Sequence, residues 1–411
     1  MNILRVKLHP ASCKYLLLGH PWITEDSFTK RFPKNDFFLV GIDEKNQKEI
    51  ALLINDPEHK NVKARLWSLN PSDWKNPIDF KHELNKRLKV SFDKRKNAKI
   101  AENRENYYLV NAESDLLPGL LILKLKNQLL IQYYALFWKQ VEKELLASLN
   151  EQFNIFYPEI ELLDIWIQER NFNQARAIRS LNGASKTEFI LKEFNLNYQI
   201  RINEHYDFGI YTDMSAIRKQ MEPYLKKAKS LLNLFCYTGA FSLFALELGV
   251  NQVVSVDLSA KYLKWLQDNL ALNPHLKTEA HTALCMPSEK ALEKCIAEKR
   301  LFECIICDPP SASSDGHTTS SALKSYEVLL PLMLKLLTKN GELFVFLNTH
   351  TVSWNKFEEK LKQIIASSEF ANQIIIGKRF KLSDDCLPLK GFNEGDYLKG
   401  LLIEFKNKGI S

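Results

Sequence analysis

The sequence predicts an α/β protein with a nucleotide-binding βαβ unit in its C-terminal half. Residues 231–235 have the composition of a buried strand, and the turn that follows contains Gly239. Residues 240–248 are typical of an apolar helix, and a second apolar strand at 253–256 runs directly into Asp257. Strand, glycine turn, helix, strand and acid, in this order, outline a unit that binds a nucleoside.

The spacing within this unit favours a nucleoside over a dinucleotide. Gly239 allows the backbone to approach a ligand closely, and the helix that follows concentrates positive potential at its N-terminus. Asp257, eighteen positions later, offers two carboxylate oxygens to ribose hydroxyls. Because the turn has a single glycine, no pyrophosphate cradle is indicated. S-adenosylmethionine (SAM) is therefore the predicted cofactor.

A second motif lies further along the chain. The apolar run at 304–307 ends in Asp308, which two prolines follow. The motif places a hydrogen-bond acceptor at the carboxyl edge of the sheet, followed by two prolines whose φ angles are fixed. Asp308 and Asp257 are expected on the ends of neighbouring strands, beside one crevice. Together the two motifs predict a methyltransferase fold.

Bulk properties narrow the class of protein. A chain of 411 residues, 45% hydrophobic and 26% charged, is typical of two or three globular domains. It has no apolar run of about twenty residues and no signal-peptide segment, which predicts a cytoplasmic location and no membrane partner. Its seven irregularly spaced cysteines do not indicate disulfides, and Cys304 and Cys307 are expected on opposite faces of a strand. No metal site is predicted.

Positive charge is concentrated near the N-terminus. Residues 1–105 carry 21 Lys and Arg against 14 Asp and Glu, which accounts for the whole net charge of +7. Much of it lies on a predicted helix within 81–105, whose apolar residues Leu84, Leu88 and Phe92 share one face. Such a helix is either a solvated surface or a contact for RNA phosphates. The candidates for phosphate contact are Lys94, Arg95 and Lys96.

The order of elements predicts three domains. Residues 1–72 contain short strands and turns that fit a small β-barrel. Residues 78–206 combine the basic helix with a strand meander in an α+β domain. Strands and helices alternate in 207–411, as a Rossmann-like domain requires. The Ser- and Thr-rich residues 311–322 are expected to form a flexible loop beside Asp308.

These features together resemble a bacterial family of class I SAM-dependent rRNA methyltransferases. Its members have an N-terminal PUA domain, a central strand-rich domain and a C-terminal Rossmann-like domain, and the best-known ones make 5-methylcytosine in large-subunit rRNA. The resemblance runs nearly end to end. Its most specific segments are Gly-His-Pro-Trp at 19–22 and Phe-Cys-Tyr-Thr-Gly-Ala-Phe-Ser at 235–242. Within the first segment, His20 and Trp22 either pack in a PUA-like domain or stack on RNA.

The resemblance implies roles for particular residues. The cofactor-binding residues it implies are Tyr211, Asp213, Phe235, Tyr237, Gly239, Asp257 and Asp308. Arg218 lies in the segment that helps to enclose the cofactor, and Tyr326 is an aromatic residue of the helix after the loop.

The chain also departs from the family pattern. The Gln-Arg pair after Asp213 is replaced by Met214-Ser215, and the acid that reads the adenine amino group is missing near 283–284. The basic residue expected after the two prolines is Ser311. In the fifth strand, Asn348 stands where the cytosine-5 enzymes have cysteine.

Asn348 bears directly on the chemistry, because it cannot add to C6 of cytosine as a thiolate does. Cys236 and Cys307 are either displaced nucleophiles or buried structural thiols. Otherwise a base nitrogen or a hydroxyl attacks the methyl group directly once it is oriented. Asp308 and Asn348 would then be the catalytic residues that hold the target base, with His317 and His350 as candidate bases.

Three functions therefore follow from the sequence. The first is a SAM-dependent RNA methyltransferase that acts on a base of large-subunit rRNA and contacts RNA through its basic N-terminal half. The second is a catalytically silent RNA-binding or ribosome-assembly protein on the same fold. The third is a small-molecule methyltransferase. A homodimer is compatible with all three.

Overall fold

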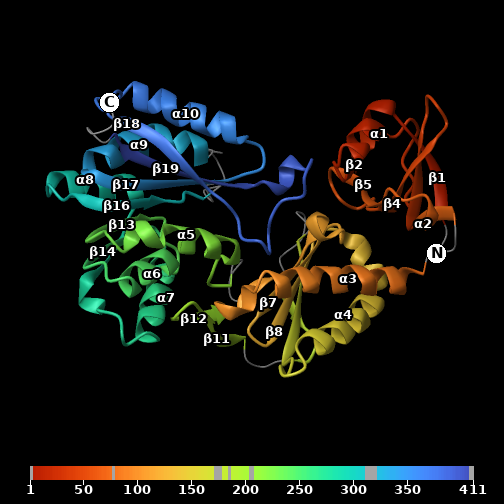
Figure 1. Cartoon of the computed structure of the whole chain (residues 1–411), viewed down its shortest axis with the longest axis horizontal. Helices are drawn as coiled ribbons and strands as arrows, with labels where there is room; N and C mark the ends of the chain where they lie inside the picture. The colour runs from red at the N-terminus through yellow and green to blue at the C-terminus, as the bar shows by residue number, and fades with distance from the viewer. Residues whose placement is uncertain are drawn as a thin grey trace. The chain divides into compact units, whose positions relative to one another are not determined.

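The computed structural model in Figure 1 divides the chain into two compact units. It describes residues 3–75, 79–170, 178–183, 187–202, 208–310 and 322–406. Unit 1 comprises 1–187 and 384–395, and unit 2 comprises 188–383 and 396–411. The chain therefore passes between the units three times. The predicted division into 1–72, 78–206 and 207–411, and the PUA assignment, stay predictions. Among the described helices, none has the length and apolar character that crossing a bilayer would require.

Unit 1 begins with a five-stranded mixed sheet in the order β1-β3-β4-β5-β2, in which only β1 and β3 are parallel. Its elements are β1 (Ile3–Leu8), α1 (Pro10–Leu17), β2 (Trp22–Thr24), β3 (Phe38–Asp43), β4 (Glu49–Asn55) and β5 (Val62–Ser68). Their apolar residues form a small core between the sheet and α1. The predicted strands of this segment are therefore present.

A second five-stranded sheet follows, in the order β10-β9-β8-β7-β6. Its elements are α2 (Ser72–Lys75), α3 (Phe80–Asn97), β6 (Asn106–Asn111), β7 (Leu120–Leu125), β8 (Gln128–Tyr133), α4 (Glu142–Phe156), β9 (Asp164–Glu169) and β10 (Ile178–Ser180). One apolar core runs from the first sheet into the second, and the ring of Trp67 in β5 stacks on Phe80 of α3 at 5.5 Å. Both sheets of unit 1 thus share a core.

Unit 2 is built on a seven-stranded sheet in the order β15-β14-β13-β16-β17-β19-β18. The strands are β13 (Ser230–Leu234), β14 (Gln252–Asp257), β15 (His281–Cys285), β16 (Phe302–Cys307), β17 (Leu337–Asn348), β18 (Ile374–Phe380) and β19 (Leu398–Phe405). All neighbours from β15 to β17 are parallel, whereas β19 is antiparallel to both β17 and β18. The Rossmann-like fold class predicted from the sequence is confirmed.

Helices cover both faces of this sheet (Figure 1). They are α5 (Ser215–Leu225), α6 (Ala240–Glu247), α7 (Ala260–Ala271), α8 (Ser288–Ala297), α9 (Ala322–Leu336) and α10 (Trp354–Ala366), and the hairpin of β11 (Glu188–Glu193) and β12 (Leu196–Arg201) precedes them. The helices α8, α9 and α10 share one apolar core with one face of the sheet. The opposite face is covered by α5, α6 and α7.

The register of the central strands decides which residues meet at the carboxyl edge. Leu234, the last residue of β13, pairs with Val256 on one side and Cys307 on the other. Asp257 and Asp308 therefore leave the sheet at the same edge, as predicted. However, β13 separates their strands, so the expectation of neighbouring strand ends is wrong.

Candidate functional site

The chain leaves β13 through a tight turn that only glycine can complete. Phe235, Tyr237 and Gly239 have positive φ angles of 55°, 51° and 84°. A Cβ atom on Gly239 would lie 2.5 Å from Cγ of Leu266 in α7, which is too close. Two non-glycine residues at positive φ are strained, so the surrounding packing must hold the turn in place. The turn therefore keeps the backbone close to the sheet edge.

Asp257 is fixed against this turn by two backbone donors. The Tyr237 amide donates to its Oδ2 atom and the Ser259 amide to its Oδ1 atom, each at 2.9 Å. Burial raises the pKa of this half-buried carboxyl, and the backbone donors oppose the rise. Each carboxylate oxygen has a second lone pair, which suits the acceptance of hydroxyl groups from a ligand.

Apolar surface lies open next to Asp257. The side chain of Leu258 is 72% exposed. Cys285, at the end of β15, pairs in register with Asp257 and is also exposed. A large exposed apolar side chain beside a fixed acid suits an apolar part of a ligand that the acid also contacts.

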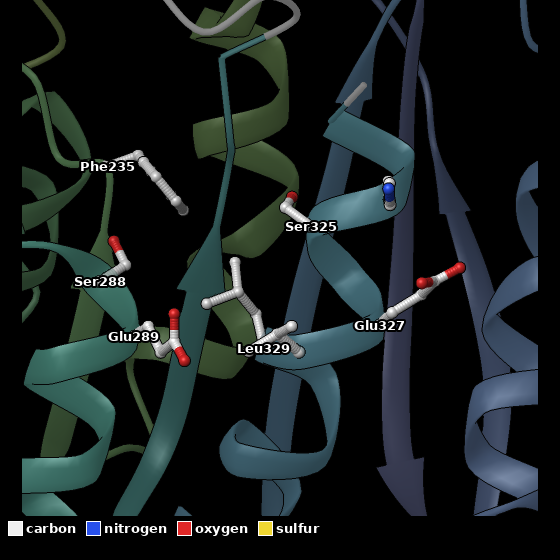
Figure 2. A pocket seen from close by; sticks show the side chains of 8 residues that line it. Phe235, Ser288, Glu289, Ser325, Glu327 and Leu329 are labelled. Atoms are coloured by element: carbon white, nitrogen blue, oxygen red, sulfur yellow. The ribbon is translucent and has the colours of Figure 1, made fainter. Parts of the chain in front are cut away.

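A pocket of about 360 Å³ opens beside the same turn (Figure 2). It is lined by Phe235, Ser288, Glu289, Lys324, Ser325, Glu327, Val328 and Leu329, from the end of β13 and the first turns of α8 and α9. Figure 2 shows Phe235 and Leu329 projecting into the space, with Glu289 close by. Glu327 is ion-paired with Lys360. Glu289 makes no hydrogen bond or ion pair with another described residue, so its carboxylate is available to a ligand.

The segment before β13 carries an aromatic side chain to the turn. The ring of Tyr211 lies 5.0 Å from that of Tyr237, which in turn lies 4.6 Å from Tyr262. Arg218, fully buried in an ion pair with Glu193 at 2.6 Å, donates to the Tyr211 carbonyl at 3.2 Å. A buried ion pair thus holds the backbone at Tyr211, and the enclosing role of this segment stays a prediction.

Asp308 and Asp213 form an electrostatically coupled pair of carboxyls. Asp213 is buried and accepts a hydrogen bond of 2.7 Å from the Tyr397 hydroxyl. Burial, with the negative charge of Asp213 added, raises the pKa of Asp308 to about 7. Near neutral pH Asp308 can therefore be ionised or protonated, and it can serve as acceptor or donor.

Asn348 reaches the same edge from the next strand. β16 ends at Cys307, which pairs with Val345, but β17 continues for three more residues to Asn348. The amide of Asn348 is exposed there. The sheet edge therefore presents a carboxyl and an amide on adjacent strand ends, and both groups can hydrogen-bond to the edge of a base.

The comparison with protein families decides what kind of site this edge is. The sequence pattern of the S-adenosylmethionine-dependent methyltransferases matches residues 163–392, more than half of the chain. The chain belongs to this family. Its cofactor is SAM, and the acid, glycine turn and pocket at the edge offer groups that suit this ligand.

Several named relatives match this methyltransferase over almost its whole length. Ribosomal RNA large subunit methyltransferase I of Pseudoalteromonas translucida is 26% identical over 408 residues, which cover 97% of this chain and 98% of that protein. The protein of the same name from Photobacterium profundum is 27% identical over 400 residues, covering 96% and 97%. The predicted resemblance is confirmed.

A solved structure extends the match to the fold. SMU.776, a provisionally assigned methyltransferase crystallised with SAH, superposes with a TM-score of 0.84 and 21% identity, over 97% of this chain and 99% of that one. At this identity the likeness shows the fold alone.

Neither candidate cysteine suits the role of a nucleophile in this methyltransferase. Cys236 and Cys307 are both buried. Burial, with the charges of Asp257 and Asp308 respectively, raises the pKa of each thiol well above its ordinary value. Because the thiolate is the reactive form, these side chains behave as structural thiols. Within the described ranges, no group of His, Cys, Asp and Glu is placed to hold a metal ion.

Of the two histidines predicted as candidate bases, the structure describes only His350. His350 is exposed two residues beyond Asn348, so it stays a candidate. His317 and residues 311–321 of the predicted loop lie outside the described residues.

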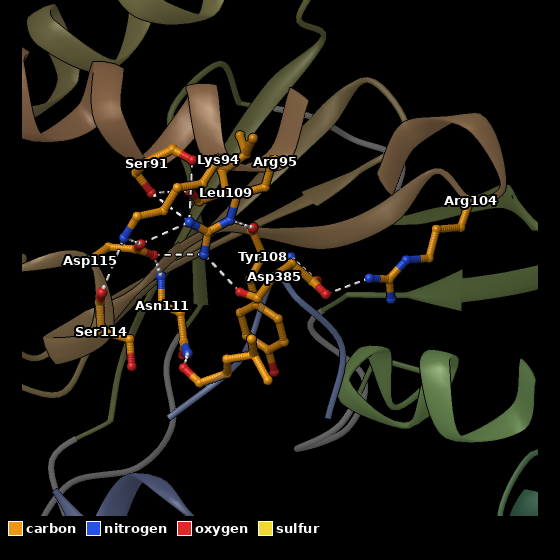
Figure 3. Close-up of polar contacts among 11 residues, drawn as sticks. Ser91, Lys94, Arg95, Arg104, Tyr108, Leu109, Asn111, Ser114, Asp115 and Asp385 are labelled. Carbon is orange, nitrogen blue, oxygen red and sulfur yellow. Dashed lines mark hydrogen bonds and ion pairs between the residues drawn. The ribbon is translucent and has the colours of Figure 1, made fainter. Parts of the chain in front are cut away.

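In unit 1, the prediction that Arg95 contacts phosphates is wrong (Figure 3). Arg95 is 4% exposed and makes a bidentate pair with Asp115 at 2.8 and 2.6 Å. Burial alone would raise the pKa of Asp115, but the hydrogen bonds and charge of Arg95 lower it below the ordinary value. Lys94 is half-exposed and also binds Asp115, at 2.9 Å. Of the three predicted residues only Lys96 is exposed without an ion pair to a described residue.

A feature that the sequence did not reveal is the segment 384–395, which packs in unit 1. Asp385 is buried, pairs with Arg104 and accepts from the Tyr108 amide at 2.9 Å (Figure 3). Further along, the ring of Phe392 lies 4.7 Å from that of Trp22. The sequence marks these residues only as a loop, so the packing is what assigns them to unit 1.

His20 and Trp22 are packing residues of unit 1. The Trp22 indole donates to Glu113 at 2.7 Å, and Glu113 also pairs with buried Arg65 at 2.8 Å. The imidazole of His20 lies 3.3 Å from the Glu394 carboxylate. These contacts favour packing over RNA stacking for both residues.

Proposed function

We propose that this methyltransferase modifies RNA, at a base of large-subunit ribosomal RNA. The relatives that match it from end to end carry the name of large-subunit rRNA methyltransferases. The observation that carries the proposal is that Asp308 and Asn348 lie at the ends of adjacent strands, where the thiols of Cys236 and Cys307 are buried. The proposed substrate also implies a cytoplasmic location.

The cofactor residues follow from the geometry of the edge. Asp257 accepts hydrogen bonds from the ribose hydroxyls, while Gly239 and Tyr237 bring the turn close to the ligand. Tyr211, Asp213 and Asp308 enclose the methionine part. Bound SAM supplies an electrophilic methyl group on a sulfonium centre.

The adenine ring lies in the pocket of Figure 2, between Phe235 and Leu329. Glu289 accepts hydrogen bonds from its exocyclic amino group. This carboxylate thereby replaces the acid that is missing near 283–284. The support is its position in the first turn of α8, on the wall of the pocket, without a partner among the described residues.

Glu289→Ala is expected to abolish discrimination by the cofactor site between adenine and hypoxanthine. S-adenosylhomocysteine should bind roughly tenfold or more weakly, because a lost polar contact costs about 1–3 kcal/mol. The affinity for S-inosylhomocysteine should hardly change. Calorimetry with both ligands measures the ratio of their dissociation constants. Glu293→Ala on the same helix is the matched control, and Asp257→Ala should weaken both ligands. A ratio unchanged by Glu289→Ala would refute the adenine pocket.

The methyl acceptor is a nitrogen of the target base, held by Asp308 and Asn348. Ionised Asp308 accepts a hydrogen bond from an N–H group of the base, and the Asn348 amide bonds to a second polar atom. If the attacking nitrogen carries a proton, that proton passes to Oδ of Asp308. A nitrogen lone pair attacks directly once it is oriented and partly desolvated, so no thiolate is required.

Methyl transfer is expected to depend on the ionisation of Asp308. Because the ionised form is the acceptor, the single-turnover rate should rise through about pH 7 and level off above it. Asp308→Asn should lower this rate by about 10²–10⁴ and remove the rise. Transfer of tritium from labelled SAM to ribosomal RNA measures both. Asp268→Asn, on α7, is the control. Full activity in Asp308→Asn would exclude this role.

The RNA backbone is contacted through the exposed face of α3 in the basic N-terminal half. Lys81, Lys89 and Lys96 are exposed there and have no ion pair with a described residue, whereas Arg87 and Arg95 are buried. Exposed lysines keep their hydration and attract phosphates without a fixed geometry. A homodimer is compatible with this arrangement.

Replacing Lys81, Lys89 and Lys96 with Gln is expected to weaken RNA binding and to flatten its salt dependence. Each lost phosphate contact should reduce the slope of log K against log salt by about 0.7–0.9. Fluorescence anisotropy with an rRNA fragment over a salt series measures the slope. Gln at Lys299, Lys339 and Lys362, which are exposed on unit 2, is the matched control. An equal effect of both triple variants would show that α3 has no special part in binding.

The second candidate is a silent RNA-binding protein. The absence of the Gln-Arg pair, with Met214 and Ser215 in its place, is the observation that favours it. It predicts RNA binding that Asp308→Ala leaves unchanged, with no transfer of the methyl group under any condition. A small-molecule methyltransferase would instead act without RNA.

A further inference from the structure

The ends of β16 and β17 separate at the proposed acceptor site. They pair in register up to Cys307 and Val345, after which β16 stops and β17 continues to Asn348 along β19. The backbone of Phe346 therefore has no residue of β16 opposite it. Buried backbone groups that lose a strand partner need another one.

The hydroxyl of Tyr326 supplies that partner. It accepts a hydrogen bond from the Phe346 amide at 3.0 Å, and lies 2.6 Å from the Phe346 carbonyl and 3.0 Å from the Cys307 carbonyl. The side chain is fully buried. Because a phenol has one proton, it donates to one carbonyl at a time. The hydroxyl thus makes the hydrogen bonds to Phe346 that a further residue of β16 would otherwise make.

We infer that Tyr326 is the positioning residue that sets the separation of Asp308 and Asn348. The inference rests on the proposed function of these two residues. Asp308 directly follows Cys307, and Asn348 lies two residues beyond Phe346, so one hydroxyl holds both strand ends. Tyr326 is too deeply buried to touch substrate itself. It acts on the reaction through the strand ends alone.

The contacts of the ring separate this role from ordinary packing. The Tyr326 ring lies 5.7 Å from that of Phe357, a contact that phenylalanine would keep. Removal of the hydroxyl alone leaves the Phe346 amide and carbonyl without this partner. The neighbouring residues Lys324, Ser325 and Leu329 line the pocket. The helix α9 therefore joins the pocket wall to the sheet edge.

Tyr326→Phe is the experiment that tests the inference. The kcat for methyl transfer to rRNA should fall at least tenfold, a larger factor than the change in the Kd for SAM, because Asp308 is the one proposed SAM contact that directly follows a residue bonded to the Tyr326 hydroxyl. Rates are expressed per SAM-binding site, so that unfolded protein does not count. Tyr224→Phe removes a hydroxyl from another aromatic cluster of unit 2 and should leave kcat unchanged.

A double-mutant cycle with Asn348→Ala shows whether the hydroxyl acts through the strand end. Tyr326→Phe should lower kcat by a smaller factor in the Asn348→Ala background than in wild type, since one of the two groups that it positions is already gone. If the double variant lowers kcat by the full product of the two single-variant factors, the inference is overturned. So would a Tyr326→Phe protein with wild-type kcat.

Amide hydrogen exchange distinguishes failure of the inference from failure of the proposed function. In Tyr326→Phe, peptides that contain Phe346 should exchange faster, at least tenfold, while those that contain Leu232 and Val254 stay protected. Unchanged protection at Phe346 overturns the inference. The proposed function fails if wild-type protein transfers no methyl group to rRNA. If Tyr326→Phe nevertheless loses protection at Phe346, the hydroxyl contact itself is supported.

Discussion

The cofactor side of the candidate site depends on the tight turn between β13 and α6. Gly239 lies so close to Leu266 that any side chain would push the turn away from the sheet. The same turn presents the Tyr237 amide to Asp257, so the acid is oriented by the backbone. Phe235, at the start of the turn, forms one wall of the pocket. The proposed ribose contact of Asp257 and the pocket wall formed by Phe235 both take their positions from this turn.

The acceptor side of the site has a different origin. Its geometry comes from two strands of unequal length and from a buried tyrosine that fills the gap between them. Burial, with the negative charge of Asp213 added, raises the pKa of Asp308 to about 7. With Cys236 and Cys307 buried, the ends of β16 and β17 offer hydrogen bonding and ionisation for catalysis. Under the proposed function, this combination takes the place of the cysteine thiolate in a chain that has Asn348 at that position.

Sequence patterns predicted the features that depend on residues close together in the sequence. The strand, glycine turn and acid around Gly239 and Asp257 are local, so the fold class and the cofactor could be predicted. Contacts between distant segments could not. Glu289 reaches the pocket only because α8 packs beside α9, and Arg95 is buried only because Asp115 faces it. A run of basic residues on a helix has the same sequence pattern whether its members are buried or exposed, which is why the phosphate role of Arg95 was predicted wrongly.

The most direct test of methyl transfer without a thiolate is a trapping measurement with RNA that contains 5-fluorocytidine. An enzyme that adds a cysteine to C6 of cytosine forms a stable covalent adduct with such RNA. The account predicts that wild-type protein with SAM and rRNA yields a methylated base other than 5-methylcytosine, and no protein–RNA adduct on a denaturing gel. An adduct together with 5-methylcytosine in the product nucleosides would contradict it.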